Sequence, residues 1–240
     1  MRKMLIILSV VSTMLFSAVM FYQPISAQSS VKSGDIIVQT IPGPTLAQKL
    51  SERAQNSWLW YIVRGSGIVA AVCLIILMLS GIGFITGHSF RFLEPIIAWA
   101  SHRALGIVLG ISLLLHMVGL LFDKFVPFSI LNLLVPWSSN YKPVTLFGFQ
   151  LGSLNIALGV LAFYILVLIT VTSLLAIKDT KPRLWKFSHL LSYVVMVFVF
   201  FHSLYLGTDL AGGFLRYAWI AIGVLILLAS LYRLWRAKTT

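Results

Sequence analysis

Four of the five histidines in this chain lie in two apolar stretches, one pair in each. His102 and His116 stand fourteen positions apart in "HRALGIVLGISLLLH", and His189 and His202 stand thirteen apart in "HLLSYVVMVFVFFH". At 1.5 Å per helical residue, each pair would extend over about 20 Å. Histidines placed in this way either pack as polar residues inside a helix bundle or serve as ligands.

The expected depth of the four imidazoles favours the second role. One complete hydrophobic span, residues 149–177, separates the two stretches, so both should cross a membrane in the same direction. His102 is then expected at the level of His189, and His116 at the level of His202. Two facing imidazoles at one level are what a low-spin heme needs, with one nitrogen on each side of the iron. Two such levels would form an electron path across the membrane.

Membrane helices are the elements that would position these histidines. Hydrophobic residues make up 59% of the 240 positions and charged residues only 10%. Runs of about 20 apolar residues, the length that crosses a bilayer, occur at 58–87, 104–122, 149–177, 187–206 and 214–232. We therefore expect an all-α polytopic membrane protein, a bundle of five to six transmembrane helices with the hemes held between two parallel helices.

A sixth helix is present if the first hydrophobic run is retained. "MLIILSVVSTMLFSAVMFY" begins at Met4 behind two basic residues, and it is typical either of a signal peptide cleaved after Ala27 or of an uncleaved anchor helix. Both alternatives place residues 28–57 outside the cytoplasm. A Gly-Pro break at 43–44 in that polar segment predicts a linker followed by a short amphipathic helix.

The positions of Lys and Arg give the orientation. With residues 28–57 outside, the short cytoplasmic segments hold 11 of the 18 basic residues. These eleven are Arg2, Lys3, Arg91, Arg103, Lys178, Lys181, Arg183, Lys186, Arg233, Arg236 and Lys238. Such an excess predicts a bacterial-type cell membrane protein whose basic tail, residues 233–240, is cytoplasmic. The net charge of +12 is therefore mainly a topology signal, and we expect no nucleic-acid partner.

Several function classes are disfavoured by what the spans lack. Asp and Glu fall only in loops or at span ends, whereas ion-coupled transporters usually depend on buried carboxylates. No glycine-rich nucleotide motif occurs, so we expect no flavin or nicotinamide site in this chain. The single cysteine, Cys73, excludes a disulfide framework or a thiolate metal cluster.

Other residues are expected beside the hemes. Gly106 and Gly110 would leave one flank of the first histidine helix open for a flat macrocycle, although G-x-x-x-G is also a general helix-packing motif. Arg64 lies inside an apolar run, where an unpaired charge is costly, so we expect it to pair with a propionate of the outer heme. The alternative is that its charge extends to the membrane interface. Arg103, beside His102, is expected to serve the inner propionates.

The thirteen-residue spacing raises a geometric difficulty. At about 100° per residue, fourteen positions return to within about 40° of the starting face, but thirteen leave the second imidazole about 140° away. A straight helix would not direct both His189 and His202 at the same neighbour. Either a π-bulge or a strong tilt interrupts the helix, or the two hemes lie on different sides of it.

These features resemble the ferric reductase-like transmembrane domain of ferric reductases and NADPH oxidases. The resemblance rests on six hydrophobic runs, "WLWYIVRGSGIVA" at the start of the second, and the two spaced histidine pairs, and it covers roughly residues 58–232. In that family the pairs hold two b-type hemes that move electrons outward. The resemblance implies the same roles for His102 with His189 and for His116 with His202, and it favours keeping the first run as a helix.

The resemblance implies transmembrane electron transfer from a cytoplasmic flavoprotein or a membrane quinol to an extracytoplasmic acceptor. Ferric reductases and oxidases continue into flavin and nicotinamide domains, whereas only a short tail follows the last span here. We therefore expect an oxidoreductase membrane subunit rather than a complete enzyme. Two alternatives stay open: the heme-binding membrane subunit of an extracytoplasmic methionine sulfoxide reductase-type system, and a non-catalytic heme-binding redox sensor or scaffold.

The donor side is expected at the basic loop before the second histidine helix. Lys181, Arg183 and Lys186 lie in "IKDTKPRLWKFSH", which leads directly into His189. This basic face is a candidate docking site for an acidic electron donor, because complementary charge speeds and orients encounter. The alternative is that these charges only determine topology.

Overall fold

The computed structural model describes residues 46–89, 93–123, 128–146, 149–151, 153–175 and 177–239. The chain divides into two compact units, Met1–Glu52 and Arg53–Thr240. Of the first unit, only the beginning of one helix is described. The predictions for the first hydrophobic run, its cleavage and the linker up to residue 45 fall outside the described residues.

Five helical segments of the described chain are long and apolar enough to cross a membrane. They belong to α2 (Leu46–Thr86), α3 (Pro95–Leu121), α5 (Leu154–Leu174), the consecutive pair α7 (Pro182–Leu190) and α8 (Ser192–Leu206), and α9 (Gly213–Thr239). A bilayer core offers no water to the backbone, so apolar segments of this length satisfy their N–H and C=O groups as helices. The expected all-α membrane bundle is confirmed.

Short elements connect the spans. They are α4 (Ile130–Leu134), α6 (Ile177–Thr180), the 3-10 helix η2 (Thr208–Leu210) and the strands β1 (Val144–Leu146) and β2 (Phe149–Leu151). The two strands pair antiparallel, with Thr145 opposite Gln150. The sequence had placed residues 149–151 inside the predicted span 149–177, but these residues form β2 instead. The helix begins at Leu154 because Ser153 caps it, its side chain accepting a hydrogen bond of 3.3 Å from the Ile156 N–H.

The first histidine helix begins earlier than the hydrophobic run that predicted it. α3 begins at Pro95, not at residue 104, because proline suits the first helical turn, where its missing N–H costs nothing. His102 and Arg103 therefore lie about two turns inside α3 rather than at its start. At the other end of the connection, α2 ends before Gly87, whose φ of 78° is a left-handed conformation that glycine adopts readily.

The second histidine helix is interrupted between its two histidines. α7 ends at Leu190, and the N–H of Leu191 contacts the carbonyl oxygens of Phe187 at 3.3 Å and Ser188 at 3.1 Å before α8 begins. The Ser188 hydroxyl donates to the Trp185 carbonyl at 2.9 Å, a back-bonding contact associated with helix bends. A turn thus separates the two histidines, and the angular relation of one straight helix does not apply to them.

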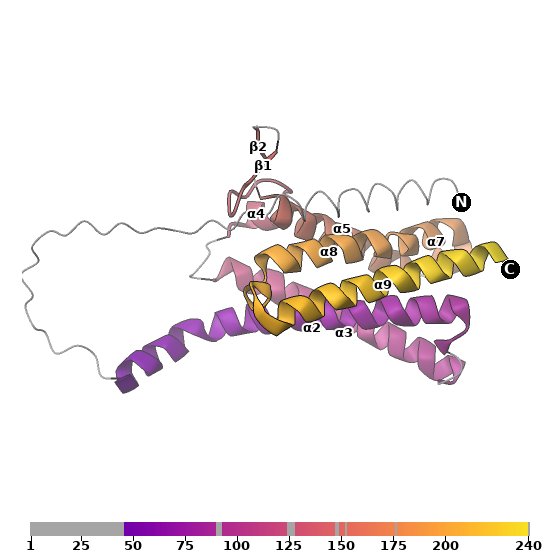
Figure 1. Cartoon of the computed structure of the whole chain (residues 1–240), viewed down its shortest axis with the longest axis horizontal. Helices are drawn as coiled ribbons and strands as arrows, with labels where there is room; N and C mark the ends of the chain where they lie inside the picture. The colour runs from indigo at the N-terminus through magenta and orange to yellow at the C-terminus, as the bar shows by residue number, and fades with distance from the viewer. Residues whose placement is uncertain are drawn as a thin grey trace, which may run out of the picture. The chain divides into compact units, whose positions relative to one another are not determined.

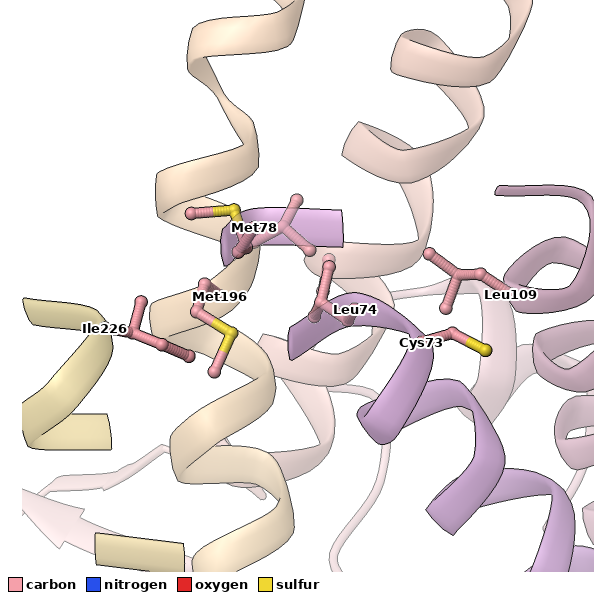
Figure 2. Packing of buried hydrophobic residues seen from close by; sticks show 8 residues of the cluster. Cys73, Leu74, Met78, Leu109, Met196 and Ile226 are labelled. Carbon is pink, nitrogen blue, oxygen red and sulfur yellow. The ribbon is translucent and has the colours of Figure 1, made fainter. Parts of the chain in front are cut away.

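The core of the bundle lies between the two histidine levels. Figure 1 shows the long helices α2, α3, α8 and α9 of the second unit running lengthwise. Their buried side chains meet with those of α5 in one cluster: Cys73, Leu74, Met78, Leu109, Ala162, Val195, Met196 and Ile226. Figure 2 shows six of these side chains, from α2, α3, α8 and α9, converging. Leu109 lies seven residues from both His102 and His116, so this cluster occupies the middle of the histidine stretch.

Close packing holds this core together. Lipid tails are as apolar as leucine, so the association of membrane helices depends on van der Waals packing and hydrogen bonds between helices rather than on removal of apolar surface from water. Small residues permit the close approach that packing needs. A Cβ atom at Gly223 of α9 would lie 2.4 Å from the Phe200 ring of α8, and the Trp219 indole N–H donates to the Phe200 carbonyl at 3.2 Å.

Candidate heme-binding site

The structure brings His116 of α3 and His202 of α8 together. Their ring centroids are 6.5 Å apart and the ring planes are inclined at 80°. A metal-bound imidazole nitrogen lies about 2 Å from the metal and about 1 Å from its own ring centre, so two imidazoles on opposite sides of one iron have ring centres about 6 Å apart. The separation of His116 and His202 agrees with that value.

Both of these imidazoles donate through Nδ1 to a backbone carbonyl. The His116 Nδ1–H donates to the Val63 oxygen at 2.8 Å, and the His202 Nδ1–H donates to the Asn155 oxygen at 2.9 Å. A carbonyl can only accept, so the proton of each neutral ring lies on Nδ1 and the lone pair lies on Nε2. This is the tautomer that a metal ligand needs, with its orientation fixed by a hydrogen bond from the other nitrogen.

Two glycines make room for these rings. A Cβ atom at Gly67 of α2 would lie 3.0 Å from the His116 Nδ1, and one at Gly159 of α5 would lie 2.6 Å from the His202 Nδ1. Neither position accepts a larger residue without displacing the imidazole. The close backbone approach is what lets the Val63 and Asn155 carbonyls reach the histidines.

His102 and His189 are expected to form the second level, and their surroundings differ from those of His116 and His202. The His102 Nδ1 lies 2.9 Å from the Ser80 Oγ of α2. The His189 ring packs on Trp185, with centroids 4.3 Å apart, and its buried Nδ1 has no hydrogen-bond partner in the described part of the chain.

Aromatic rings surround His102. The Phe84 centroid lies 5.4 Å from the His102 centroid, and the Trp99 centroid lies 6.5 Å from it. Phe84 and Trp99 also contact each other, with centroids 4.7 Å apart. Together with Trp185 on His189, three large rings give this level an aromatic environment.

Each histidine helix is backed by an antiparallel neighbour that touches it near both levels. The contacts are Val63 with His116, Ser80 with His102, Asn155 with His202, and Thr172 with Ser188, whose hydroxyls are 2.9 Å apart. On α2 and α5 the lower-numbered residues meet the higher-numbered residues of the partner, so α2 runs antiparallel to α3 and α5 runs antiparallel to α7 and α8. From the sequence, Arg64 was the residue of α2 expected at the site, and no residue of α5 was identified.

The donor set and the space around it fit a heme with two axial imidazoles. A Cβ atom at Gly106 or Gly110 would meet nothing within 4 Å, so both positions leave a flank of α3 open, as expected. Within the described residues, His, Cys, Asp and Glu form no group of three or more that would bind a metal ion. The contact between His116 and His202 is a pair, and heme ligation by the four histidines stays a prediction.

Arg64 is held by a carboxylate of the chain itself. Its guanidinium forms an ion pair with Asp209 of η2 and lies over the Trp60 ring, 4.7 Å from the centroid. The side chains of Arg64 and Asp209 are 36% and 18% exposed, so solvent partly screens the attraction between the two charges. Arg64 directly follows Val63, whose carbonyl holds His116. A contact between Arg64 and a heme propionate stays a prediction.

Arg103 and the basic loop lie on exposed positions. The Arg103 side chain is exposed on α3, and Lys181, Arg183 and Lys186 are exposed around the start of α7. In the tail, the Arg233 guanidinium lies over the Tyr193 ring, 5.2 Å from its centroid, and donates to the Tyr193 hydroxyl. The predicted roles of Arg103 and the loop stay predictions.

Sequence reasoning found the histidines but missed the residues that hold them. Gly67 lies three residues after Arg64 in "WLWYIVRGSGIVA", the stretch on which the family resemblance partly rests, so a signal for it was present. Gly159 and Ser80 carry no local motif, and the Val63 and Asn155 carbonyls belong to the backbone. Asp209 was noted only as a loop carboxylate, seven residues after His202.

A comparison with known protein families matches part of the chain. Residues 94–200 match the family model described as ferric reductase like transmembrane component. The match contains His102, His116 and His189 and ends two residues before His202. It confirms the family resemblance that the histidine spacing indicated. No curated protein and no solved structure matches the chain.

Proposed function

We propose that this ferric reductase-like membrane protein transfers electrons across a bacterial-type cell membrane through two b-type hemes, from a cytoplasmic or quinol donor to an extracytoplasmic acceptor. The family match and the five apolar helices support transmembrane electron transfer in general. The number of hemes, their ligands and the direction of transfer belong to the proposal.

One observation carries the proposal. The imidazole centroids of His116 and His202 lie 6.5 Å apart, and the Nδ1 of each ring donates to a backbone carbonyl. With each Nδ1 hydrogen-bonded to a carbonyl, the Nε2 of each ring carries the lone pair that a metal ligand needs. Two axial imidazoles are the ligands of a low-spin electron-transfer heme.

The four histidines would hold two hemes at two levels. His116 and His202 would bind the outer one, and His102 and His189 the inner one, with Arg64 and Arg103 expected at the respective propionates. A heme with two axial nitrogens supplies one-electron chemistry without an open coordination site. The acceptor would therefore take its electron at the heme edge rather than by binding the iron. The apolar core around Leu109 excludes water between the levels.

The orientation belongs to the same proposal. Residues 28–57 would lie outside and the C-terminal tail inside, in accordance with the distribution of basic residues. The inner level would then face the exposed basic residues of the Lys181–Lys186 segment, where a flavoprotein could dock. A quinol would reach the same level from the bilayer.

Heme stoichiometry tests the proposal directly. The purified protein should contain two b-type hemes per chain, measured as pyridine hemochrome against protein concentration, with absorption spectra of bis-imidazole ligation. One heme per chain would contradict the two-level arrangement. A protein that folds and inserts without heme would leave the histidines as packing residues and remove the proposed function.

A further inference from the structure

We propose that Ser80 is a positioning residue of the inner heme: its hydroxyl oxygen accepts the Nδ1 proton of His102, fixes the imidazole for ligation and sets the reduction potential of the inner iron separately from that of the outer one. This inference rests on the proposed function, because it assigns a role to a residue beside one of the proposed ligands.

The hydrogen bonds around Ser80 determine which atom donates. The Ser80 hydroxyl donates to the Leu77 carbonyl of its own helix at 3.1 Å. With its single proton engaged there, the Ser80 oxygen acts as an acceptor toward the His102 Nδ1 at 2.9 Å. Ligation of a metal through Nε2 requires this same arrangement, with the His102 proton on Nδ1.

The backbone of α2 brings Ser80 to this position. The neighbouring Gly81 lies close to the same ring, since a Cβ atom there would be 3.9 Å from the His102 Cε1. The Ser80 carbonyl also accepts a hydrogen bond of 3.4 Å from the Ser89 hydroxyl. Two hydrogen bonds therefore hold Ser80, one from its hydroxyl to the Leu77 carbonyl and one from the Ser89 hydroxyl to its own carbonyl. Its hydroxyl oxygen lies beside the His102 imidazole.

The inner level depends on Ser80 more than the outer level depends on any one side chain. His116 and His202 each have a backbone carbonyl as acceptor, whereas the His189 Nδ1 has no partner among the described residues. Ser80, on α2, is thus the side chain that hydrogen-bonds the inner imidazole of His102. No substitution of a side chain can remove a carbonyl acceptor, but one substitution removes this hydroxyl.

The sign of the effect follows from ligand basicity. A hydrogen bond accepted from Nδ1–H makes the imidazole a more basic ligand. A more basic ligand stabilises the ferric state over the ferrous state, so the reduction potential falls. Loss of the Ser80 hydroxyl should therefore raise the potential of the inner heme and leave that of the outer heme unchanged.

Spectroelectrochemical titration of the heme-loaded protein tests this role. We expect Ser80→Ala to shift to more positive potential the component that His102→Ala eliminates, and Ser80→Thr, which keeps a hydroxyl, to restore it. Ser230→Ala is the matched control, because its buried hydroxyl donates to the Ile226 carbonyl of its own helix at 2.6 Å and, among the described residues, is hydrogen-bonded to no histidine. The control should leave both potentials unchanged.

The outcomes separate this inference from the proposed function. A wild-type protein without two hemes would contradict the proposed function before Ser80 is tested. Two hemes with an inner potential that does not change in Ser80→Ala would overturn the role of Ser80 while the proposed function stands. An equal shift of both components, or an equal shift in Ser230→Ala, would also overturn it, because it would show a general effect of losing a buried hydroxyl. If Ser80→Ala fails to insert, the potential of Ser80→Cys, with its weaker acceptor, replaces it in the same comparison.

Discussion

The two histidine levels differ in the groups that contact their imidazoles. At the His116 and His202 level, both imidazoles donate to backbone carbonyls, and glycines bring those carbonyls close. At the His102 and His189 level, one imidazole faces a hydroxyl, the other packs on Trp185, and aromatic rings enclose the site. The first level is fixed by the backbone, and the second by side chains.

This difference has a physical consequence for variation. A carbonyl acceptor survives any side-chain substitution that preserves the helix, so the outer ligands keep their tautomer unless a bulky residue displaces the ring. A hydroxyl or an indole can be lost by a single substitution. In the proposed arrangement, side chains would therefore adjust the redox properties of the inner level, whereas the outer level would be sensitive mainly to the size of the neighbouring residues.

Removal of the ligands themselves should have the largest effect. We expect His116→Ala or His202→Ala to eliminate one heme absorption component completely, and His102→Ala or His189→Ala to eliminate the other. Low-temperature absorption spectra of the reduced protein would resolve the two components. If His102→Ala and His116→Ala remove the same component, the assignment of ligands by depth is wrong.

Filling the space beside His202 should have the next largest effect on heme content. Gly159→Ala would place a Cβ atom 2.6 Å from the His202 Nδ1, so the ring must move and its bond to the Asn155 carbonyl must lengthen or break. We expect loss of most of the outer heme, measured by pyridine hemochrome. Gly81→Ala is the control at the inner level, since its Cβ atom would lie 3.9 Å from the His102 ring, an ordinary contact. Equal heme loss in both variants would show that the two levels do not differ in this respect.

The rate of heme reduction should depend on the basic residues near the inner level. Reversal of Lys181, Arg183 and Lys186 to glutamate should slow heme reduction by an acidic soluble flavoprotein on the order of tenfold at low ionic strength, because steering by complementary charge is lost. The difference from wild type should shrink as salt screens the charges. Stopped-flow absorbance measures the rate, and reduction by quinol serves as the control. Unchanged kinetics in correctly inserted protein would leave these residues as topology determinants.

The smallest effect is expected at the Arg64 and Asp209 ion pair. Because the pair is partly exposed, Arg64→Ala or Asp209→Ala should lower the free energy of unfolding by about 1 kcal/mol or less, measured by thermal unfolding in detergent. Potentials sharpen the comparison. If Arg64 also neutralises an outer propionate, Arg64→Ala should lower the outer potential, because a cation favours the added electron, and Asp209→Ala should raise it. No shift in either variant would restrict the pair to joining α2 with η2.

The angular difficulty of the second histidine helix shows where sequence reasoning reaches its limit. The thirteen-residue spacing predicted that a straight helix could not direct both imidazoles at one neighbour, and the helix is in fact interrupted at Leu191. The position of the turn could not be predicted, because "HLLSYV" contains neither proline nor glycine. The hydroxyl of Ser188 in α7 contacts that of Thr172 in α5, and no local sequence pattern indicates this contact between helices.

Hydrophobic run length and histidine spacing by themselves determined the membrane class, the five described spans and the candidate ligands, because a bilayer imposes helices on apolar segments and a heme needs two imidazoles at one depth. Helix starts were less predictable, as Pro95 and Ser153 show, because hydropathy does not register caps or strands. Only the tertiary structure decided which groups accept the hydrogen bonds of His102, His116 and His202. Those partners lie 22 to 53 residues away along the chain, and two of them are backbone carbonyls that every residue possesses. Their selection depends on how antiparallel helices approach each other at glycines, which is a property of packing in three dimensions.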